Sequence, residues 1–516
     1  MFQPFLLKPG TSSSEVLKVI RVLTNEKKWG KAEIVARQGL RAFPKNHELF
    51  IEFTKILAET NRHTDAITAL QGGINSSPLE PNLYLELQNH YFRMRDFKSM
   101  EVNHKNFLNA WSRGLRNVHR RRKAMVFYGL SAVLSLYRSD YSAIDRWSAQ
   151  LLAAKPIEAA SKTAPRRTIS TSQRPHVGFI STQITGHAVS RFIGPLLLNL
   201  TDRNKYTLFY DIDEGTDKGL SKTEQFLHKA HSKINIVKIS SDNAKESCSA
   251  IQKEEIDILI ELAGHFSGAP TNILAMKPAP IQASWIGYPS HPGLSCIDYF
   301  LTDSFCQPET DYLGDFRHKI YQFGRFFSIY EDETFDDVKS DWQPAEMVRF
   351  GSFNNISKLS HATLETWAQV LKNLPQSTLN LKFVASYPYE LDQIKRFFHS
   401  HGLLERVAIM DTSPNHSKHL EQYSHIDIAL DTFPYCGTTT TCEALNMGVP
   451  VVTLLGGDHL SRVGAGILRS VGCEELIATS EQDYVQKAVT LAIDSKRLKH
   501  YHKSLKDMFL SSPLSD

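Results

Sequence analysis

The sequence predicts an α/β protein in which two Rossmann-like halves follow an α-helical segment of tetratricopeptide-like repeats. Three observations support this fold class. Residues near the start of the chain match one another at a fixed offset. From His176 onward, short β-rich runs alternate with helical stretches, and a second series of the same kind starts at Val348. Alternating strands and helices are typical of a parallel, doubly wound sheet, so two series predict two sheets.

The repeat prediction rests on four pairs of positions separated by 34 residues, the period of the tetratricopeptide helix–turn–helix unit. The pairs are Ala32 and Ala66, Ala36 and Leu70, Gly39 and Gly73, and Pro44 and Pro78. Small residues let two helices approach closely, and proline ends a helix. A third copy is degraded, because Met100 stands where an alanine is expected, although Tyr91, Phe97 and Trp111 supply apolar anchors. Chance spacing within ordinary helical packing is the alternative.

Two to three such units, with a helix-like stretch from about Val118 to Ala153, would form one α-solenoid over residues 1–153. A solenoid offers a concave surface that binds protein. Residues 154–175 are rich in Ser, Thr, Pro and basic side chains and lack periodicity, which predicts a linker or surface loop.

Ten β-rich runs predict the two sheets, five in an N-terminal half at residues 176–340 and five in a C-terminal half at residues 341–516. The runs are Val177–Ser181, Tyr206–Tyr210, Ile234–Ile239, Ile256–Leu262, Ile281–Ile286, Val348–Phe353, Leu379–Val384, Val407–Met410, Ile426–Asp431 and Val451–Leu455. The acidic, turn-rich stretch from Tyr330 to Asp341 predicts a hinge between the halves. Two hinged halves form a cleft, and ligands of such sheets bind at the carboxyl ends of the strands.

The composition excludes several classes of protein. The net charge of +4 on 516 residues is too mild for a dedicated nucleic-acid binder. The six cysteines show no C-x-x-C pair, and H-E-x-x-H is absent, so neither common zinc pattern is present. Scattered thiols are typical of a reducing compartment. The start of the chain lacks a basic region and a long apolar run, and no stretch is long enough to span a bilayer. We therefore expect a cytoplasmic protein without membrane insertion.

The most informative segment runs from Leu430 to Pro450 and contains four consecutive threonines, Thr438 to Thr441. A buried strand is expected to end at Asp431, Gly437 permits a tight turn, and the threonines open a helix that ends at Gly448. Threonines suit a helix start better than its interior. Their hydroxyls, the free N–H groups of the first turn and the helix dipole predict a site for a diphosphate. Glu443, one turn further on, is placed to accept hydrogen bonds from ribose hydroxyls. The alternative is an ordinary strand–turn–helix, for which one threonine would be enough.

A second candidate lies in Gly351-Ser-Phe-Asn-Asn-Ile-Ser-Lys358, where a strand ends in a polar loop and a helix begins near His361. Lys358 would face the cleft from the carboxyl end of the first strand of this half. A lysine there can neutralise the charge that builds on a departing nucleoside diphosphate, which a metal does in other enzymes. A solvated loop lysine is the alternative.

Histidines follow several strands and could face the same cleft. His187 follows the first strand of the N-terminal half and is a candidate general base. His265 and His291 follow later strands of that half, and His419 precedes a strand of the other half, beside the expected nucleotide. A surface role is the alternative for any single loop histidine.

Together these segments resemble the protein O-glycosyltransferase family of the O-GlcNAc transferases and the plant SPINDLY proteins, from about His176 to the C-terminus. The matching stretches are Val177-Gly-Phe-Ile-Ser with His187, Ile256-Asp-Ile-Leu-Ile-Glu-Leu-Ala-Gly-His, Lys277-Pro-Ala-Pro-Ile-Gln-Ala-Ser-Trp-Ile-Gly-Tyr-Pro, Gly351-Ser-Phe-Asn-Asn-Ile-Ser-Lys, Leu430-Asp-Thr-Phe-Pro through Gly-Val-Pro450, and Ser461-Arg-Val-Gly-Ala-Gly. The combination, rather than any one motif, carries the resemblance.

The resemblance implies a GT-B fold and an inverting, metal-independent sugar transfer from a nucleotide donor to serine or threonine hydroxyls of proteins. It implies no cofactor, and a protein acceptor bound in part by the repeats. Lys358 and His187 would be catalytic, and His265 and His291 would lie on the acceptor side. The residues implied to bind the donor are Asn355, His419, Thr438, Thr439, Thr440, Glu443, Tyr288 and Pro289.

Departures from the family leave the sugar open. Animal O-GlcNAc transferases place a histidine directly after the glycine, whereas this chain has Thr438, as SPINDLY-type members do. Ser290-His291-Pro292 replaces a usual threonine near the donor sugar, and Pro270 replaces a basic residue. UDP-GlcNAc is the default donor. The first alternative is a SPINDLY-like protein O-fucosyltransferase that uses GDP-fucose, which the threonine run favours, and the second is a transferase for a CMP-linked or other bacterial-type sugar. A non-catalytic repeat adaptor and a transferase for small molecules or glycans are the competing classes.

Overall fold

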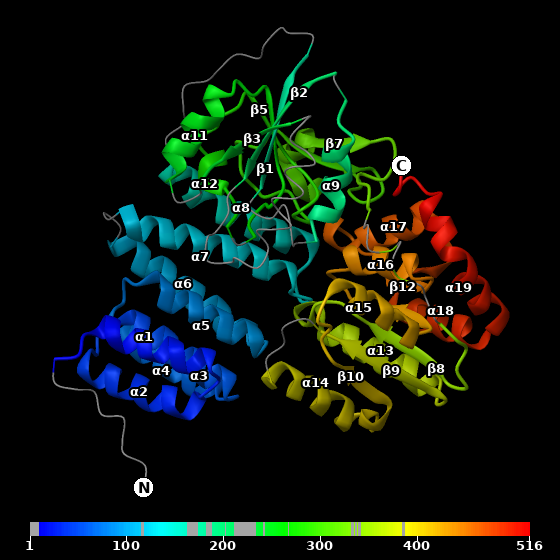
Figure 1. Cartoon of the computed structure of the whole chain (residues 1–516), viewed down its shortest axis with the longest axis horizontal. Helices are drawn as coiled ribbons and strands as arrows, with labels where there is room; N and C mark the ends of the chain where they lie inside the picture. Colours follow the sequence, from blue (N-terminus) through cyan, green and yellow to red (C-terminus); the bar gives the residue numbers. More distant parts are fainter. Residues whose placement is uncertain are drawn as a thin grey trace. The chain divides into compact units, whose positions relative to one another are not determined.

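The computed structural model describes most of the chain (Figure 1). The described residues are 10–114, 118–161, 174–181, 188–201, 203–210, 234–240, 243–266, 268–331, 335, 338, 342–383 and 388–516. Eight helices come first, followed by two series of alternating strands and helices. This order confirms the predicted fold class.

The N-terminal helices are α1 (Ser13–Asn25), α2 (Trp29–Ala42), α3 (His47–Glu59), α4 (His63–Ser76), α5 (Pro81–Arg93), α6 (Phe97–Gly114), α7 (Val118–Leu136) and α8 (Ala143–Ala160). The remaining α-helices are α9 (Ser190–Leu198), α11 (Ala244–Lys253), α12 (Thr271–Leu274), α13 (His361–Asn373), α14 (Pro388–Ser400), α15 (His416–Glu421), α16 (Thr439–Asn446), α17 (Val463–Val471), α18 (Glu481–Ile493) and α19 (Ser495–Leu510). Among the described residues, no helix combines the length and apolar character needed to cross a membrane.

The first sheet has seven parallel strands in the order β3-β2-β1-β4-β5-β6-β7, and the second has six in the order β10-β9-β8-β11-β12-β13. The strands of the first sheet are β1 (His176–Ser181), β2 (Lys205–Tyr210), β3 (Asn235–Lys238), β4 (Ile258–Glu261), β5 (Ile281–Ser284), β6 (Tyr299–Asp303) and β7 (Ile320–Phe323). The second sheet contains β8 (Val348–Ser352), β9 (Ser377–Lys382), β10 (Val407–Met410), β11 (Ile428–Leu430), β12 (Val451–Leu454) and β13 (Ile477–Ala478). In each sheet the strand order reverses next to the strand that comes first in the sequence, β1 or β8. In Rossmann-like sheets the ligand crevice lies at this switch point.

The helical repeats follow the period that the sequence predicts. The first helices of the three pairs begin at Ser13, His47 and Pro81, each 34 residues after the last. The matched small residues face inward: a Cβ on Gly39 would lie 2.8 Å from Cγ1 of Val16, and one on Gly73 would lie 3.0 Å from the Phe50 ring. The glycines therefore let the second helix of each pair approach its neighbours closely.

The chain forms two compact units, and the division does not follow the order of the chain. One unit contains residues 1–131 together with residues 385–397, and the other contains residues 132–384 and 398–516. Most of α14 thus packs with the repeats, although its chain position is inside the second sheet. In that unit, Asn61 Nδ2 donates to Asp392 Oδ2 at 3.0 Å, and the His63 and Tyr389 ring centroids are 4.8 Å apart.

Several details differ from the expected boundaries. The stretch from Val118 to Ala153 contains two helices, and α8 continues to Ala160, inside the expected linker. The rest of that linker, at residues 162–173, and most of the expected hinge are outside the described residues. Strands β6, β7 and β13 were not among the ten predicted runs.

Candidate active site

Polar and charged side chains gather at the carboxyl ends of three neighbouring strands of the second sheet, β9, β8 and β11. Lys382 is the last residue of β9, Asn354 and Lys358 follow β8, and Asp431 follows β11. These residues are far apart in sequence, but the parallel sheet brings the ends of their strands to one edge.

The threonine run lies at the N-terminus of α16, as predicted. Thr438 is the N-cap residue, and its side chain makes no capping hydrogen bond to the first turn. Thr438, Thr439 and Thr440 are half-buried, and Thr440 Oγ1 donates to Asn354 Oδ1 at 3.0 Å. A helix start without a side-chain cap keeps N–H groups and positive dipole charge for an anion. The helix ends at Asn446, two residues before Gly448, which has a φ of 79°.

Asp431 shapes the turn that precedes these threonines. Its buried Oδ1 accepts hydrogen bonds from the backbone N–H groups of Gly437, at 2.6 Å, and Thr432, at 2.8 Å. Its Oδ2 accepts one from Thr453 Oγ1 at 2.7 Å. A Cβ on Gly437 would lie 2.6 Å from Thr441 Oγ1, so close packing requires glycine there. Burial raises the pKa of Asp431. The sequence placed this residue at a strand end without a role.

Lys358 reaches the same turn from the loop after β8. It belongs to the short 3₁₀ helix η4 (Ile356–Lys358), and its Nζ donates to the carbonyl oxygen of Cys436 at 2.9 Å, one residue before Gly437. The ammonium also lies 4.0 Å from the centroid of the Tyr435 ring. Burial lowers the pKa of Lys358, while the nearby Cys436 and Asp431 oppose that shift. The structure therefore brings the predicted lysine to the residue preceding the threonine turn.

Glu443 lies inside α16 and is buried, with its two oxygens in different surroundings. Oε2 accepts a hydrogen bond from Tyr423 Oη at 3.2 Å and lies 3.0 Å from His419 Nε2. Oε1 lies 3.9 Å from a guanidinium nitrogen of Arg191, which α9 of the N-terminal half supplies. Burial alone would raise the pKa of Glu443, but the hydrogen bond from His419 and the charge of Arg191 bring it below its usual value. The group is thus held as a carboxylate, the form that accepts hydrogen bonds from hydroxyls.

The other residues expected in the second half are placed less centrally. Asn355 is exposed, and its side chain accepts a hydrogen bond from Ser357 N at 2.9 Å, so it caps η4.

His416, His419 and Glu443 have ligand atoms within 4.8 Å of one another, close enough to be considered for a cation. However, the ammonium of Lys382 lies 2.7 Å from His419 Nδ1 and would repel a metal ion there.

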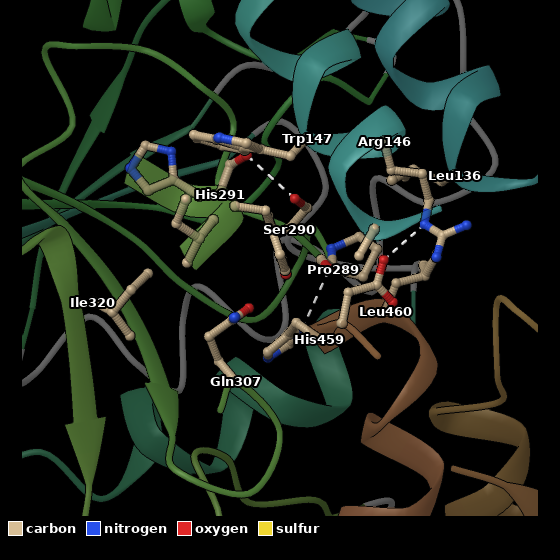
Figure 2. Close-up of a pocket in the computed structure, with 14 residues that line it drawn as sticks. Leu136, Arg146, Trp147, Pro289, Ser290, His291, Gln307, Ile320, His459 and Leu460 are labelled. Atoms are coloured by element: carbon tan, nitrogen blue, oxygen red, sulfur yellow. Dashed lines mark hydrogen bonds and ion pairs between the residues drawn. The ribbon is translucent and has the colours of Figure 1, made fainter. Parts of the chain in front are cut away.

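Figure 2 shows the loop after β5, where the N-terminal half supplies Pro289 and His291. His291 is 3 % exposed, its Nδ1 accepts from Gly293 N at 2.9 Å, and its ring centroid lies 5.7 Å from that of Trp147. Burial, with the charge of Lys319, lowers its pKa to about 3. The half-buried Pro289 has its carbonyl oxygen 3.3 Å from His459 Nδ1. The small cavity here, about 20 Å³, has room for about one water molecule.

Tyr288 and His265 are also interior groups. Tyr288 donates to Gln150 Oε1 of α8 at 2.7 Å, and His265 Nε2 lies 2.6 Å from the carbonyl oxygen of Pro292. Burial lowers the pKa of His265 to about 4, so its ring is neutral at pH 7. The donor role of Tyr288 and the acceptor role of His265 and His291 stay predictions. His187, the candidate base, is outside the described residues.

A buried ion pair joins α8 to the C-terminal half. Arg146 Nε of α8 lies 2.7 Å from Asp458 Oδ2, and the two side chains are 9% and 11% exposed (Figure 2). The pair links the helix to the turn that follows β12.

The sequence did not assign roles to Asp431, Asn354, Lys382, Tyr423 or Arg191, which contact the predicted residues. Each is a single polar or charged side chain in a strand or helix, or just after a strand. Only their position at strand ends, for Lys382 and Asp431, could have indicated them.

The model of glycosyl transferase family 41 matches residues 131–334 and 336–516. The chain belongs to this family. This is a family of glycosyltransferases, and the two parallel sheets of the chain are the halves of a GT-B fold.

Relatives are found among plant and animal members of the family. The chain is 35% identical over 354 residues to a Petunia hybrida protein described as a probable UDP-N-acetylglucosamine–peptide N-acetylglucosaminyltransferase SPINDLY, with 66% of this chain and 37% of the relative covered. A Caenorhabditis elegans UDP-N-acetylglucosamine–peptide N-acetylglucosaminyltransferase is 22% identical over 476 residues, with 68% and 40% covered. The chain thus spans well under half the length of these relatives.

Among solved structures, an O-GlcNAc transferase variant from Thermobaculum terrenum matches with a TM-score of 0.78 at 23% identity. The match covers 98% of this chain and 96% of that one, so the same fold extends over the repeats as well as the two sheets.

Proposed function

We propose that this family 41 member is a protein O-glycosyltransferase that moves a sugar from a nucleoside diphosphate to serine or threonine hydroxyls, with inversion and without a metal. One observation carries the proposal. The Lys358 ammonium donates a hydrogen bond to the Cys436 carbonyl oxygen at 2.9 Å, just before the turn into α16. A cation and an uncapped helix start converge where a pyrophosphate would lie.

The proposed reaction requires the site to stabilise a leaving group. An acceptor oxygen forms a bond to the anomeric carbon as the bond to the donor phosphate breaks, and the electron pair leaves with the nucleoside diphosphate. Lys358 and the first-turn N–H groups of α16 would neutralise the charge that develops there, the task of preorganised donors in an active site. His187 is proposed to take the proton of the acceptor hydroxyl.

The donor end is proposed to bind through Glu443 and His419. A carboxylate that is held ionised accepts hydrogen bonds from the hydroxyls of a ribose. Because ribose and diphosphate occur in both UDP and GDP sugars, this part of the site suits either donor. UDP-GlcNAc is the first candidate, since the names of the Petunia and Caenorhabditis relatives specify it.

A second donor, GDP-fucose, is favoured by one residue. Thr438 occupies the position after Gly437 where animal O-GlcNAc transferases are expected to have histidine. A threonine there matches the SPINDLY-type pattern, and the relatives of that name are also more similar to this chain than the Caenorhabditis protein is.

The acceptor is proposed to be a protein that the helical repeats help to bind. Helices α4, α5 and α6 border a groove of about 630 Å³ whose lining includes the exposed side chains of Gln71, Asn75 and Asn106. Amide side chains can donate to and accept from a peptide backbone. An Asn75→Ala, Asn106→Ala variant is expected to raise the acceptor KM and leave donor hydrolysis unchanged.

The direct test is turnover by the purified full chain with a panel of nucleotide sugars, including UDP-GlcNAc, GDP-fucose and CMP-linked sugars. Donor hydrolysis and the intact mass of candidate acceptor proteins are measured with and without EDTA. Mass increments that persist in EDTA support the proposal. A non-catalytic adaptor would bind acceptor protein but consume none of the donors, and transfer only to free glycans would contradict a protein acceptor.

A further inference from the structure

Lys382 is a buried lysine beside His419, one of the residues proposed to bind the donor. Lys382 is the last residue of β9, and only 2% of it is exposed. Its Nζ lies 2.7 Å from Ser413 Oγ and 2.7 Å from His419 Nδ1. The ammonium is also 5.4 Å from the centroid of the Phe353 ring. Because the side chain is buried and its ammonium meets Ser413 and His419, these neighbours can pass its effect to the rest of the site.

The contact with His419 fixes where the imidazole carries its proton. A lysine ammonium has three donors and no acceptor, so the ring nitrogen that it meets must accept. Nδ1 of His419 is therefore the unprotonated nitrogen, and the hydrogen is on Nε2. Nε2 faces Glu443 Oε2 at 3.0 Å, so the ring donates to the carboxylate. The chain of donors runs from ammonium to imidazole to carboxylate.

The two oxygens of Glu443 then have separate tasks. Oε2 receives hydrogen bonds from His419 and from Tyr423, whose hydroxyl is 3.2 Å away. Oε1 is turned toward the N-terminal half, where a guanidinium nitrogen of Arg191 lies 3.9 Å away. With Oε2 held by two donors, the carboxylate has a fixed orientation, and a fixed acceptor binds a diol better than a rotating one.

We propose that Lys382 is a positioning residue of the donor site, which sets the tautomer of His419 and thereby aims the Glu443 carboxylate at the ribose of the nucleotide. The inference rests on the proposed function, because it takes a ribose-containing donor as the ligand. It adds a residue that does not touch the substrate.

Removing the ammonium would open two other states of the ring. If the proton moved to Nδ1, the lone pair of Nε2 would face the carboxylate oxygen and repel it. If both nitrogens were protonated, Glu443 would be locked in an ion pair with the ring. Burial lowers the pKa of Lys382 to about 8, partly offset by the charge of Glu443, so the ammonium form still dominates at pH 7. The protein therefore keeps a costly buried cation where its hydrogen bonds order the site.

The test compares the binding of UDP and GDP with that of their 2′,3′-dideoxy forms by calorimetry, using full-length protein at pH 7. In the wild type, loss of the ribose hydroxyls is expected to weaken binding about tenfold or more, since hydrogen bonds to a charged acceptor are lost. In Lys382→Met the ratio should fall below about threefold, and Lys382→Arg, which keeps a cationic donor, should restore part of it. Lys418→Met, on an exposed lysine that pairs with Glu421 next to His419, is the matched control and should keep the wild-type ratio.

A merely structural lysine would weaken both forms of the nucleotide equally, and an unchanged ratio in Lys382→Met would overturn the inference. Should that variant fail to fold, ¹⁵N NMR of histidine-labelled wild-type protein decides the question, with the His419 signals assigned by their loss in His419→Gln. A proton on Nε2 supports the inference, and a proton on Nδ1 overturns it. Wild-type protein that bound neither UDP nor GDP would contradict the proposed function, and the tautomer would still decide the inference.

Discussion

The ammonium nitrogen of Lys358 lies 2.9 Å from the carbonyl oxygen of Cys436, although the two residues belong to different strand–helix connections of the second sheet. That carbonyl accepts a hydrogen bond from the ammonium, and a diphosphate would offer stronger acceptors beside it. The lysine is therefore already directed at the turn where the leaving group is proposed to lie.

The first prediction concerns this lysine. Lys358→Ala is expected to lower sugar transfer by at least about 100-fold, because one preorganised charge at the leaving group is lost. The circular dichroism spectrum and the thermal midpoint should stay close to the wild type, since the fold loses one hydrogen bond, to the Cys436 carbonyl, and the buried Asp431 keeps its bonds to Gly437, Thr432 and Thr453. Lys418→Ala, on an exposed side chain, is the control and should retain full activity. Full activity in Lys358→Ala would contradict the proposed role of Lys358 in stabilising the departing diphosphate.

A second prediction tests the packing of the repeats with two glycines of one helix. A Cβ on Gly39 would lie 2.8 Å from Val16, whereas one on the exposed Gly30 would meet nothing within 4 Å. Gly39→Ala gains about 1 kcal/mol of helix propensity, and Gly30→Ala, in the first turn of α2, gains no more than that, so a lower stability of Gly39→Ala reports the clash. Urea unfolding should find Gly39→Ala less stable than Gly30→Ala by about 1–3 kcal/mol. Equal stabilities would show that the α1–α2 contact is looser than described.

The third prediction concerns the ion pair between Arg146 and Asp458. Arg146→Met leaves the nearly buried Asp458 without its partner, and the expected loss of stability is about 3 kcal/mol or more. Arg325→Met serves as control, because the ion pair of Arg325 with Asp516 is exposed and should contribute less than about 1 kcal/mol. Chemical unfolding of both variants measures the difference. A cost of the same size for both would mean that water reaches the buried pair.

A fourth prediction follows from the low pKa of His291, about 3 against 6.5 for an unburied ring. As the pH falls below 6.5, the unfolded chain takes up a proton that the folded ring does not, so stability is lost on acidification. From pH 7 to pH 5, the His291 ring alone should lower the free energy of unfolding by about 2 kcal/mol. His291→Phe should remove that part of the pH dependence in urea unfolding, while His361→Phe, on an exposed side chain, should not. An unchanged pH dependence would mean that the buried ring gains a proton in the folded protein.

The sequence predicted most of the fold because its main patterns are local. Runs of β-branched and apolar residues identified ten strands, and small residues at a fixed period identified the repeats. Strands β6 and β7 were missed because no helix-like stretch separates them clearly from their neighbours. β13 has only two residues, too few for any periodicity.

The site was predicted where residue type and local position agree, as for the threonine run before Glu443. Lys382 and Arg191 could not be predicted, because a single cation in a strand or helix has no local pattern. Their partners come from other elements, and only the register of parallel strands and the packing of the two halves determine which charges meet. The buried surroundings of His265 and His291 could not be foreseen for the same reason, since α8 and the aromatic residues around them are distant in sequence.

The packing of α14 with the repeats affects how shortened forms of this enzyme should be interpreted. A protein that begins after residue 131 would lack the helices that α14 lies against, so the Tyr389 face of α14 would lose its cover. Helix α14 would then lose the contacts that hold it against the repeats. Loss of turnover after such a deletion would therefore not identify the repeats as the acceptor-binding part, whereas point substitutions in their groove leave this anchorage intact.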